Sequence, residues 1–281
     1  MAWILFASGA AALAHQVVWT RRLVDILGAS AETFSRVVGA FCIGLALGSA
    51  WASLRPANPT SGWSRILRAE LAVAGLGALS LAAVPIADTL REWAVSDAWL
   101  RGVLPLSLVA PPAIAMGLVL PSALAVLPPG PSVVRAYAVN TFGGVAGIAL
   151  AVFWALPALG LVRTGLGACL INLSVAAGAW LAWRRDPRPT LRASAPFPDA
   201  GRVSRPQASG AIAFASGFLV MGLEVTAQQQ FAQVTINSHF SGSALLVIVL
   251  LALAAASLVA VRWPGSESWA PRTASLIAAG V

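Results

Sequence analysis

Long uncharged runs of apolar residues recur along the whole chain, separated by short connectors that carry arginine and other polar residues. A helix needs about 20 mostly apolar residues to cross the hydrocarbon layer of a bilayer. Backbone groups find no water there, and the alternating pattern of a membrane barrel is absent, so these runs predict helices. We expect eight complete membrane spans, at residues 2–19, 33–54, 71–87, 102–127, 136–159, 164–183, 209–224 and 241–261.

The composition excludes an ordinary water-soluble domain. Hydrophobic residues make up 58% of the chain and charged residues only 10%, with a mean hydropathy of +0.82. Soluble domains carry roughly 25% charged residues. Cys42 and Cys169 lie inside apolar runs, which favours buried thiols over a disulfide or a metal site. The first run has no basic leading segment and no small-residue cleavage site, so we expect it to remain as a membrane span.

The net charge of +8 comes from 18 arginines, with no lysine in the chain. The arginines are scattered between the apolar runs and no aromatic polar surface accompanies them, which argues against a nucleic-acid partner. If the N-terminus is cytoplasmic, 12 of the 18 arginines fall on the cytoplasmic side. The positive-inside rule therefore predicts a multi-pass protein in the lipid bilayer with a cytoplasmic N-terminus.

An arginine- and proline-rich linker at residues 184–209 divides the chain into a six-span repeat, residues 1–183, and the start of a second repeat, residues 210–281. The tetrapeptide FASG occurs at Phe6 and again at Phe214, an offset of 208 residues, and the same offset pairs Leu45 with Leu253. Six spans separate the copies, so both enter the membrane in the same direction, as in the parallel repeats of major-facilitator transporters. The offset also makes residues 273–281 the opening of a ninth span, so we expect a longer parent protein.

Three stretches carry a family resemblance. SGAAALAHQVVWTRRLVDILGASAETFSRVVGAFCIGLALGS at residues 8–49, LVAPPAIAMGLVLPSAL at residues 108–124 and RAYAVNTFGGVAGIALAVFWALPALGL at residues 135–161 resemble the bacterial fused membrane and spermidine-synthase-like proteins. The resemblance implies an all-helical, major-facilitator-like region of the bacterial inner membrane. It also implies a role in anchoring a cytoplasmic aminopropyltransferase domain and in binding or passing a small amine.

The chain itself shows no sign of catalysis. A nucleoside-binding turn needs a glycine-rich loop after a strand, and a polyamine site needs clustered acids, and neither pattern is found. We therefore expect no catalytic residue and no cofactor. Two other functions stay open: a secondary transporter without a transferase domain, and a structural membrane subunit that packs against other membrane subunits.

Polar residues inside predicted spans are candidate cavity residues, because burying them in a membrane is costly unless they are paired or hydrated. Gln16 and Glu224 occupy equivalent repeat positions, and we expect them to line an outward cavity with His15. A solvated place at the outer interface is the alternative for Glu224. No metal site is expected, because neither His15 nor His239 has a ligand at metal-binding spacing.

Tyr137, Asn140 and Thr141 fall on one side of a predicted helix, at spacings i, i+3 and i+4. They either bond to a neighbouring helix or line an inward-facing site.

Small residues and prolines set the expected helix packing. Two glycine pairs at a spacing of four, Gly44 with Gly48 and Gly143 with Gly147, predict close helix contacts, with packing inside the chain favoured over contact between copies. Four prolines in residues 102–127 predict a kinked or broken helix. Such a helix either lines a polar cavity or forms a static bend.

Overall fold

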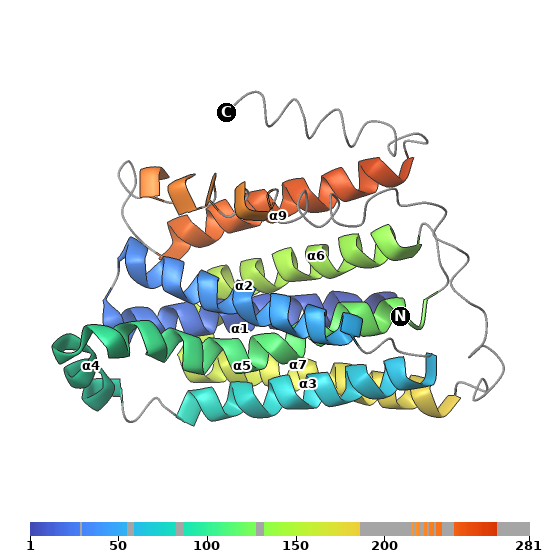
Figure 1. Ribbon diagram of the computed structural model, residues 1–281, viewed down its shortest axis with the longest axis horizontal. Coiled ribbons are helices and arrows are strands. Elements are labelled where there is room, and N and C mark those ends of the chain that lie inside the picture. Colours follow the sequence, from blue (N-terminus) through green and yellow to red (C-terminus); the bar gives the residue numbers. More distant parts are fainter. Residues whose placement is uncertain are drawn as a thin grey trace.

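A computed structural model describes residues 1–28, 30–54, 59–82, 87–127, 132–185 and 239–262, and some residues between 215 and 231. The secondary structure of these residues is entirely helical (Figure 1), which confirms the all-helical class. The elements are α1 (Ala2–Leu27), α2 (Ala31–Leu54), α3 (Pro59–Ala82), α4 (Ala87–Ser96), α5 (Ala98–Leu124), α6 (Ser132–Leu150), the π-helical turn η2 (Ala151–Ala155), α7 (Leu156–Arg185) and α9 (His239–Arg262).

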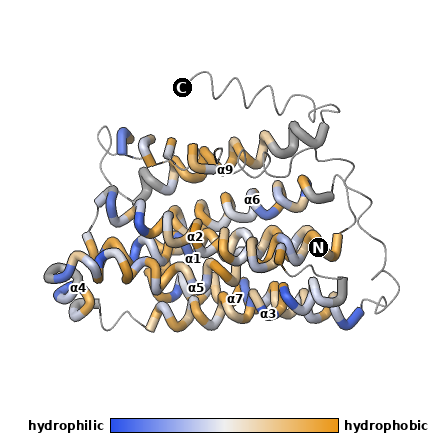
Figure 2. Tube along the Cα trace, in the orientation of Figure 1, coloured by the Kyte–Doolittle hydropathy of each residue, from blue (hydrophilic) through white to orange (hydrophobic). Residues whose placement is uncertain are grey.

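Four helical segments in the described part are long and apolar enough to cross a membrane: Ala2–Leu27, Glu32–Leu54, Ala98–Leu124 and Val134–Arg185. Apolar residues dominate the middle of the long helices, and hydrophilic residues gather at the end of α7 and around α4 (Figure 2). This distribution agrees with the membrane protein that the composition predicts. The expected run at residues 209–224 lies mostly outside the described residues, so the count of eight spans stays a prediction.

The long helices lie side by side and alternate in direction (Figure 1). Helix α2 packs against α5, α1 against α6 and α7, α3 against α5 and α7, and α9 against α6. Helix α1 therefore has α6 on one side and the α3–α7 pair on the other. The short helix α4 lies at one end of the bundle (Figure 1), where it contacts α1 and α5.

Helix α3 begins at Pro59, about three turns before the span expected at residue 71. The charged residues Arg65, Arg68 and Glu70 lie within it, which is why hydropathy alone placed its start too late. Its inward face continues through this region, because Ile66 and Val73 are both fully buried. The helix therefore carries Glu70 into the bundle at about half its length.

Glycines bring α2 and α5 into close contact. A Cβ atom on Gly44 would lie 2.5 Å from the Cβ of Ala113, and one on Gly48 would lie 3.0 Å from the Cα of Gly117. Such short separations leave no room for a side chain on α2. The first glycine pair thus packs inside the chain, against α5.

The second glycine pair brings α6 against α1. A Cβ atom on Gly143 would collide with the backbone of Phe6, and one on Gly147 with the backbone of Ala10. Gly9 of α1 makes the reciprocal approach to the backbone of Asn140. Backbone contacts on both sides fix how α1 and α6 align along their length.

The main break in helical backbone lies at Gly160 and not in the proline-rich segment. Helix α5 runs as one element from Ala98 to Leu124 with Pro105, Pro111, Pro112 and Pro121 inside it. Gly160 has φ 76° and ψ 177°, a conformation that essentially only glycine adopts. The chain turns there between the spans predicted at residues 136–159 and 164–183.

Candidate functional site

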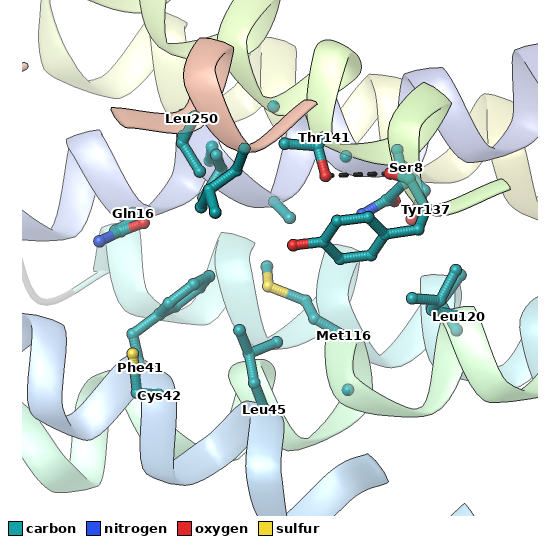
Figure 3. Close-up of a pocket in the computed structure, with 18 of the residues that line it drawn as sticks. Ser8, Gln16, Phe41, Cys42, Leu45, Met116, Leu120, Tyr137, Thr141 and Leu250 are labelled. Carbon is teal, nitrogen blue, oxygen red and sulfur yellow. Dashed lines mark hydrogen bonds between the residues drawn. The ribbon is translucent and has the colours of Figure 1, made fainter. Parts of the chain in front are cut away.

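A cavity of about 330 Å³ lies between α1, α2, α5, α6 and α9 (Figure 3). Most of its wall is apolar, and the Tyr137 ring and the Met116 thioether point into it. The polar side chains of the wall carry hydroxyl and amide groups and no formal charge: Ser8, Gln16, Ser49, Tyr137, Asn140 and Thr141. The described part of the wall is thus suited to a small ligand with both an apolar and a hydrogen-bonding part.

The three candidates on α6 lie together on this wall. Tyr137, Asn140 and Thr141 all line the cavity, as their spacing on one helix face allows. The Thr141 hydroxyl donates a hydrogen bond to the Tyr137 carbonyl oxygen one turn earlier, at 2.9 Å. The Tyr137 hydroxyl and the Asn140 amide are left to face a ligand.

The structure separates two of the other candidates, Gln16 and His15. Gln16 lines the cavity, whereas His15 lies on a different side of α1 and faces α3 and α7. Successive residues of a helix are turned by about 100°, so neighbours in sequence need not share a surface. Glu224 lies outside the described residues.

A buried carboxyl group, Glu70 of α3, lies behind the wall of the cavity. The Ser8 hydroxyl donates to Glu70 Oε1 at 2.5 Å, and the Asn172 side-chain amide donates to Oε2 at 2.6 Å. Glu70 and Asn172 are each only 1% exposed. Two helices, α1 and α7, therefore supply one donor each to a carboxyl group on a third helix.

His15 extends this cluster. Its Nε2 atom lies 3.0 Å from Asn172 Oδ1. Because the amide nitrogen of Asn172 donates to Glu70, its oxygen acts as an acceptor, and we assign the hydrogen to His15 Nε2. The amide of Asn172 thus bridges an imidazole and a carboxyl group.

The imidazole ring is held by two neighbours. It stacks on Trp19, with ring centroids 5.2 Å apart and an interplanar angle of 19°. It also lies against Gly77, where a Cβ atom would be 2.6 Å from His15 Cε1. The Trp19 indole in turn donates to Ser80 Oγ at 2.9 Å. The position of His15 therefore requires a glycine, with no side chain, at residue 77.

Ser8 joins the cavity to the cluster, since it lines the cavity and bonds to Glu70. Among the described residues, Glu70 forms no ion pair with an arginine. Ser8 and Asn172 are its hydrogen-bonding partners. We call the connected set Ser8, Glu70, Asn172 and His15 the Glu70 cluster.

Glu70 and Asn172 were not among the residues singled out from the sequence, because Glu70 precedes the apolar run that was expected to start at residue 71. A signal was present nevertheless. Trp63, Ile66, Glu70 and Val73 follow one another at spacings of three and four, and all four are buried. An acidic residue in phase with an apolar helix face indicates that it points inward.

No protein-family model matches this chain, and no curated protein or solved structure matches it. In the part of the chain that the structure describes, no group of three or more His, Cys, Asp or Glu side chains could hold a metal ion. Function is therefore inferred from the cavity and the Glu70 cluster.

Proposed function

We propose that this protein is an integral membrane protein that binds a small organic amine in its central cavity and passes it across the membrane. The observation that carries the proposal is a cavity, lined by five helices, that combines uncharged hydrogen-bonding groups with aromatic rings. Its volume of about 330 Å³ suits a compact ligand, since small-molecule pockets are typically about 300–1,000 Å³.

An alkylammonium ion fits this wall for three reasons. The rings of Phe41 and Tyr137 line the cavity, and a cation over the face of such a ring is attracted by about 0.5–2 kcal/mol. The side-chain oxygens of Gln16 and Asn140 can accept hydrogen bonds from the ammonium group. The apolar remainder of the wall accommodates methylene groups, and the carboxyl group of Glu70 lies one hydrogen bond behind Ser8.

Two helices 208 residues apart in the sequence, α2 and α9, contribute corresponding positions to the cavity. Helix α9 begins at residue 239 and ends at 262, each 208 positions after the corresponding end of α2. Four residues of α9 line the cavity, and each lies 208 positions after an α2 residue that also lines it: Val38 with Leu246, Phe41 with Val249, Cys42 with Leu250 and Leu45 with Leu253. This correspondence supports a parallel, major-facilitator-like repeat, an architecture that binds substrates at the interface of its halves.

The resemblance to the fused spermidine-synthase-like proteins supports the wider setting of the proposal. In that setting the chain is a bacterial inner-membrane domain with a cytoplasmic N-terminus that anchors an aminopropyltransferase domain. The cavity and the transferase would then act on the same class of compound, an amine.

Equilibrium binding tests the proposal. The purified full chain in lipid nanodiscs should bind radiolabelled putrescine saturably, and butylamine should compete for the site whereas 1-butanol should not. Replacing Tyr137→Leu or Asn140→Ala should weaken binding by about 5- to 30-fold, which corresponds to the loss of about 1–2 kcal/mol. Leu150→Ala is the matched control, because Leu150 is an exposed residue of α6 outside this cavity.

Transport is then measured as uptake of the same label into proteoliposomes. Saturable uptake that both cavity variants reduce supports passage across the membrane. Equal competition by 1-butanol, or no saturable binding, would contradict the amine site.

A further inference from the structure

We propose that Glu70 is a proton-binding site coupled to the cavity through Ser8, so that binding of an amine cation releases a proton from Glu70. The inference rests on the proposed amine site and gives it a coupling ion. In net terms, one ammonium ion enters the cavity as one proton leaves the Glu70 carboxyl group, and the charge of the buried region is unchanged.

The first argument is the burial of Glu70 without a charged partner. The side chain is 1% exposed, lies about halfway along α3, and is enclosed by α1 and α7. A carboxylate away from water is costly unless a cation or a proton accompanies it. No arginine of the described residues supplies that charge. A proton or a bound cation must therefore do so.

The helices around Glu70 bring few other ionisable groups near it, so the charge that accompanies its carboxylate is expected to come from the cavity. The nearby ionisable group of α1 is His15, which reaches Glu70 through Asn172, and that of α7 is Cys169, one turn from Asn172. Helix α5 carries Arg101 near its first turn and no other ionisable group. Arg65 and Arg68 of α3 come five and two residues before Glu70, so the helix turns them away from its side. Across the cavity, α6 brings the phenol of Tyr137.

The second argument is that the single hydroxyl hydrogen of Ser8 can point either to Glu70 or toward the cavity. When Glu70 is ionised, the Ser8 hydroxyl donates to Oε1, and its lone pairs are available to an ammonium N–H in the cavity. When Glu70 is protonated, the carboxyl O–H donates to Ser8 Oγ across the same 2.5 Å, and the serine hydrogen must turn away from Glu70. A protonated Glu70 thus occupies one of the two lone pairs of the serine oxygen, whereas an ionised Glu70 leaves both lone pairs to an ammonium ion in the cavity.

Release of the proton proceeds through the hydrogen bond between Glu70 and Ser8. The O–H bond of the Glu70 carboxyl group breaks as its proton forms a new O–H bond with Ser8 Oγ, and the former serine O–H bond breaks as that hydrogen passes to water entering with the cation. Reversal takes up one proton when the amine leaves. His15 keeps its hydrogen on Nε2, bonded to Asn172, in both states.

Proton release on ligand binding is the direct test. Butylamine is added to the full chain in nanodiscs in weakly buffered solution with a pH indicator, and bound butylamine is determined separately by displacement of radiolabelled putrescine. We expect about one proton released per butylamine bound. Glu70→Gln should bind butylamine and release almost none. Glu92→Gln, a change at an exposed residue of α4, should behave as the unaltered chain does.

Infrared difference spectra of the unaltered chain give a second readout that does not depend on a variant. The absorption of a protonated carboxyl group should disappear when butylamine binds. Butylamine binding without proton release and without this spectral change would overturn the coupling and leave the amine site standing. Release that persists in Glu70→Gln and is lost in His15→Gln would assign the proton to His15 and overturn the role of Glu70. Absence of saturable binding would instead overturn the proposed function.

Discussion

Asn172 is the residue on which the Glu70 cluster depends most directly, because its two amide atoms serve different partners. The nitrogen donates to Glu70 and the oxygen accepts from His15. Without this side chain, a carboxyl oxygen and an imidazole N–H would both lose their partner inside the bundle. Leaving a buried polar group unsatisfied costs about 1–3 kcal/mol.

We therefore expect Asn172→Ala to lower the free energy of unfolding by about 1–3 kcal/mol. The measurement is an unfolding titration with dodecyl sulfate in mixed micelles. Ser174→Ala on the same helix is the control, since Ser174 is exposed and bonds only to a carbonyl of its own helix. Equal stability of the two variants would show that the hydrogen bonds of Asn172 contribute nothing.

Gly77 gives a second prediction for single residues. In Gly77→Ala the new methyl group would lie 2.6 Å from His15 Cε1, and the ring cannot shift without disturbing both Trp19 and Asn172. We expect a loss of about 1–3 kcal/mol of unfolding free energy in the same titration. Gly75→Ala, two residues earlier, should be neutral or stabilising, because open space surrounds that position and alanine favours helix. The same loss in both variants would contradict this reading of the His15 site.

At the scale of helices, the contact between α2 and α5 requires a glycine at residue 48. Gly48→Ala should destabilise the bundle, because a Cβ atom there collides with the backbone of Ile114. Gly39→Ala is the matched control on α2, with nothing within 4 Å of its Cβ position. Thermal unfolding in detergent should show a lower melting temperature for the first variant only. An equally lowered melting temperature for Gly39→Ala would contradict the collision with Ile114 as the cause of the destabilisation.

The hydrophobic pattern of the sequence predicted where the helices lie, but not which neighbours the polar side chains on them contact. Each apolar run between residues 2 and 183 overlaps a long helix in the described part of the chain, because long uncharged apolar segments favour helices. Glu70 was left outside its helix because a hydropathy average cannot distinguish an exposed charge from one held by Ser8 and Asn172. His15 and Gln16 were expected to share a cavity, but which way each points depends on the neighbours of α1, which no local pattern encodes.

At the scale of the whole molecule, the alternating direction of the helices places the arginines at the two opposite ends of the bundle. At one end of the bundle they are accompanied by acids: Arg21 lies 3.6 Å from Asp25, and Arg36 lies 2.5 Å from Glu32. At the other end α7 finishes with Arg184 and Arg185, where Arg184 lies 4.0 Å above the Trp180 ring. Among the described residues, the arginines at the end of α7 have no acidic partner, and this end is the one expected in the cytoplasm.

This assignment predicts which end can be labelled from outside the cell. In a chain with Cys42→Ala and Cys169→Ala, Glu92→Cys on α4 should react with a membrane-impermeant maleimide on intact spheroplasts. Arg185→Cys should react only after permeabilisation. The native cysteines are removed so that each variant reports a single site. The reverse pattern of labelling would place the N-terminus outside.

The polar groups of the cavity wall are unevenly distributed among the helices that form it. The part of it that α9 supplies consists of Leu246, Val249, Leu250 and Leu253, whereas hydroxyl and amide groups come from α1, α2 and α6. An elongated amine would accordingly lie with its nitrogen toward the polar groups of α1, α2 and α6 and with its carbon tail against α9. Recognition of the head group and measurement of tail length would then belong to different halves of the polypeptide, and each could change in evolution without altering the other.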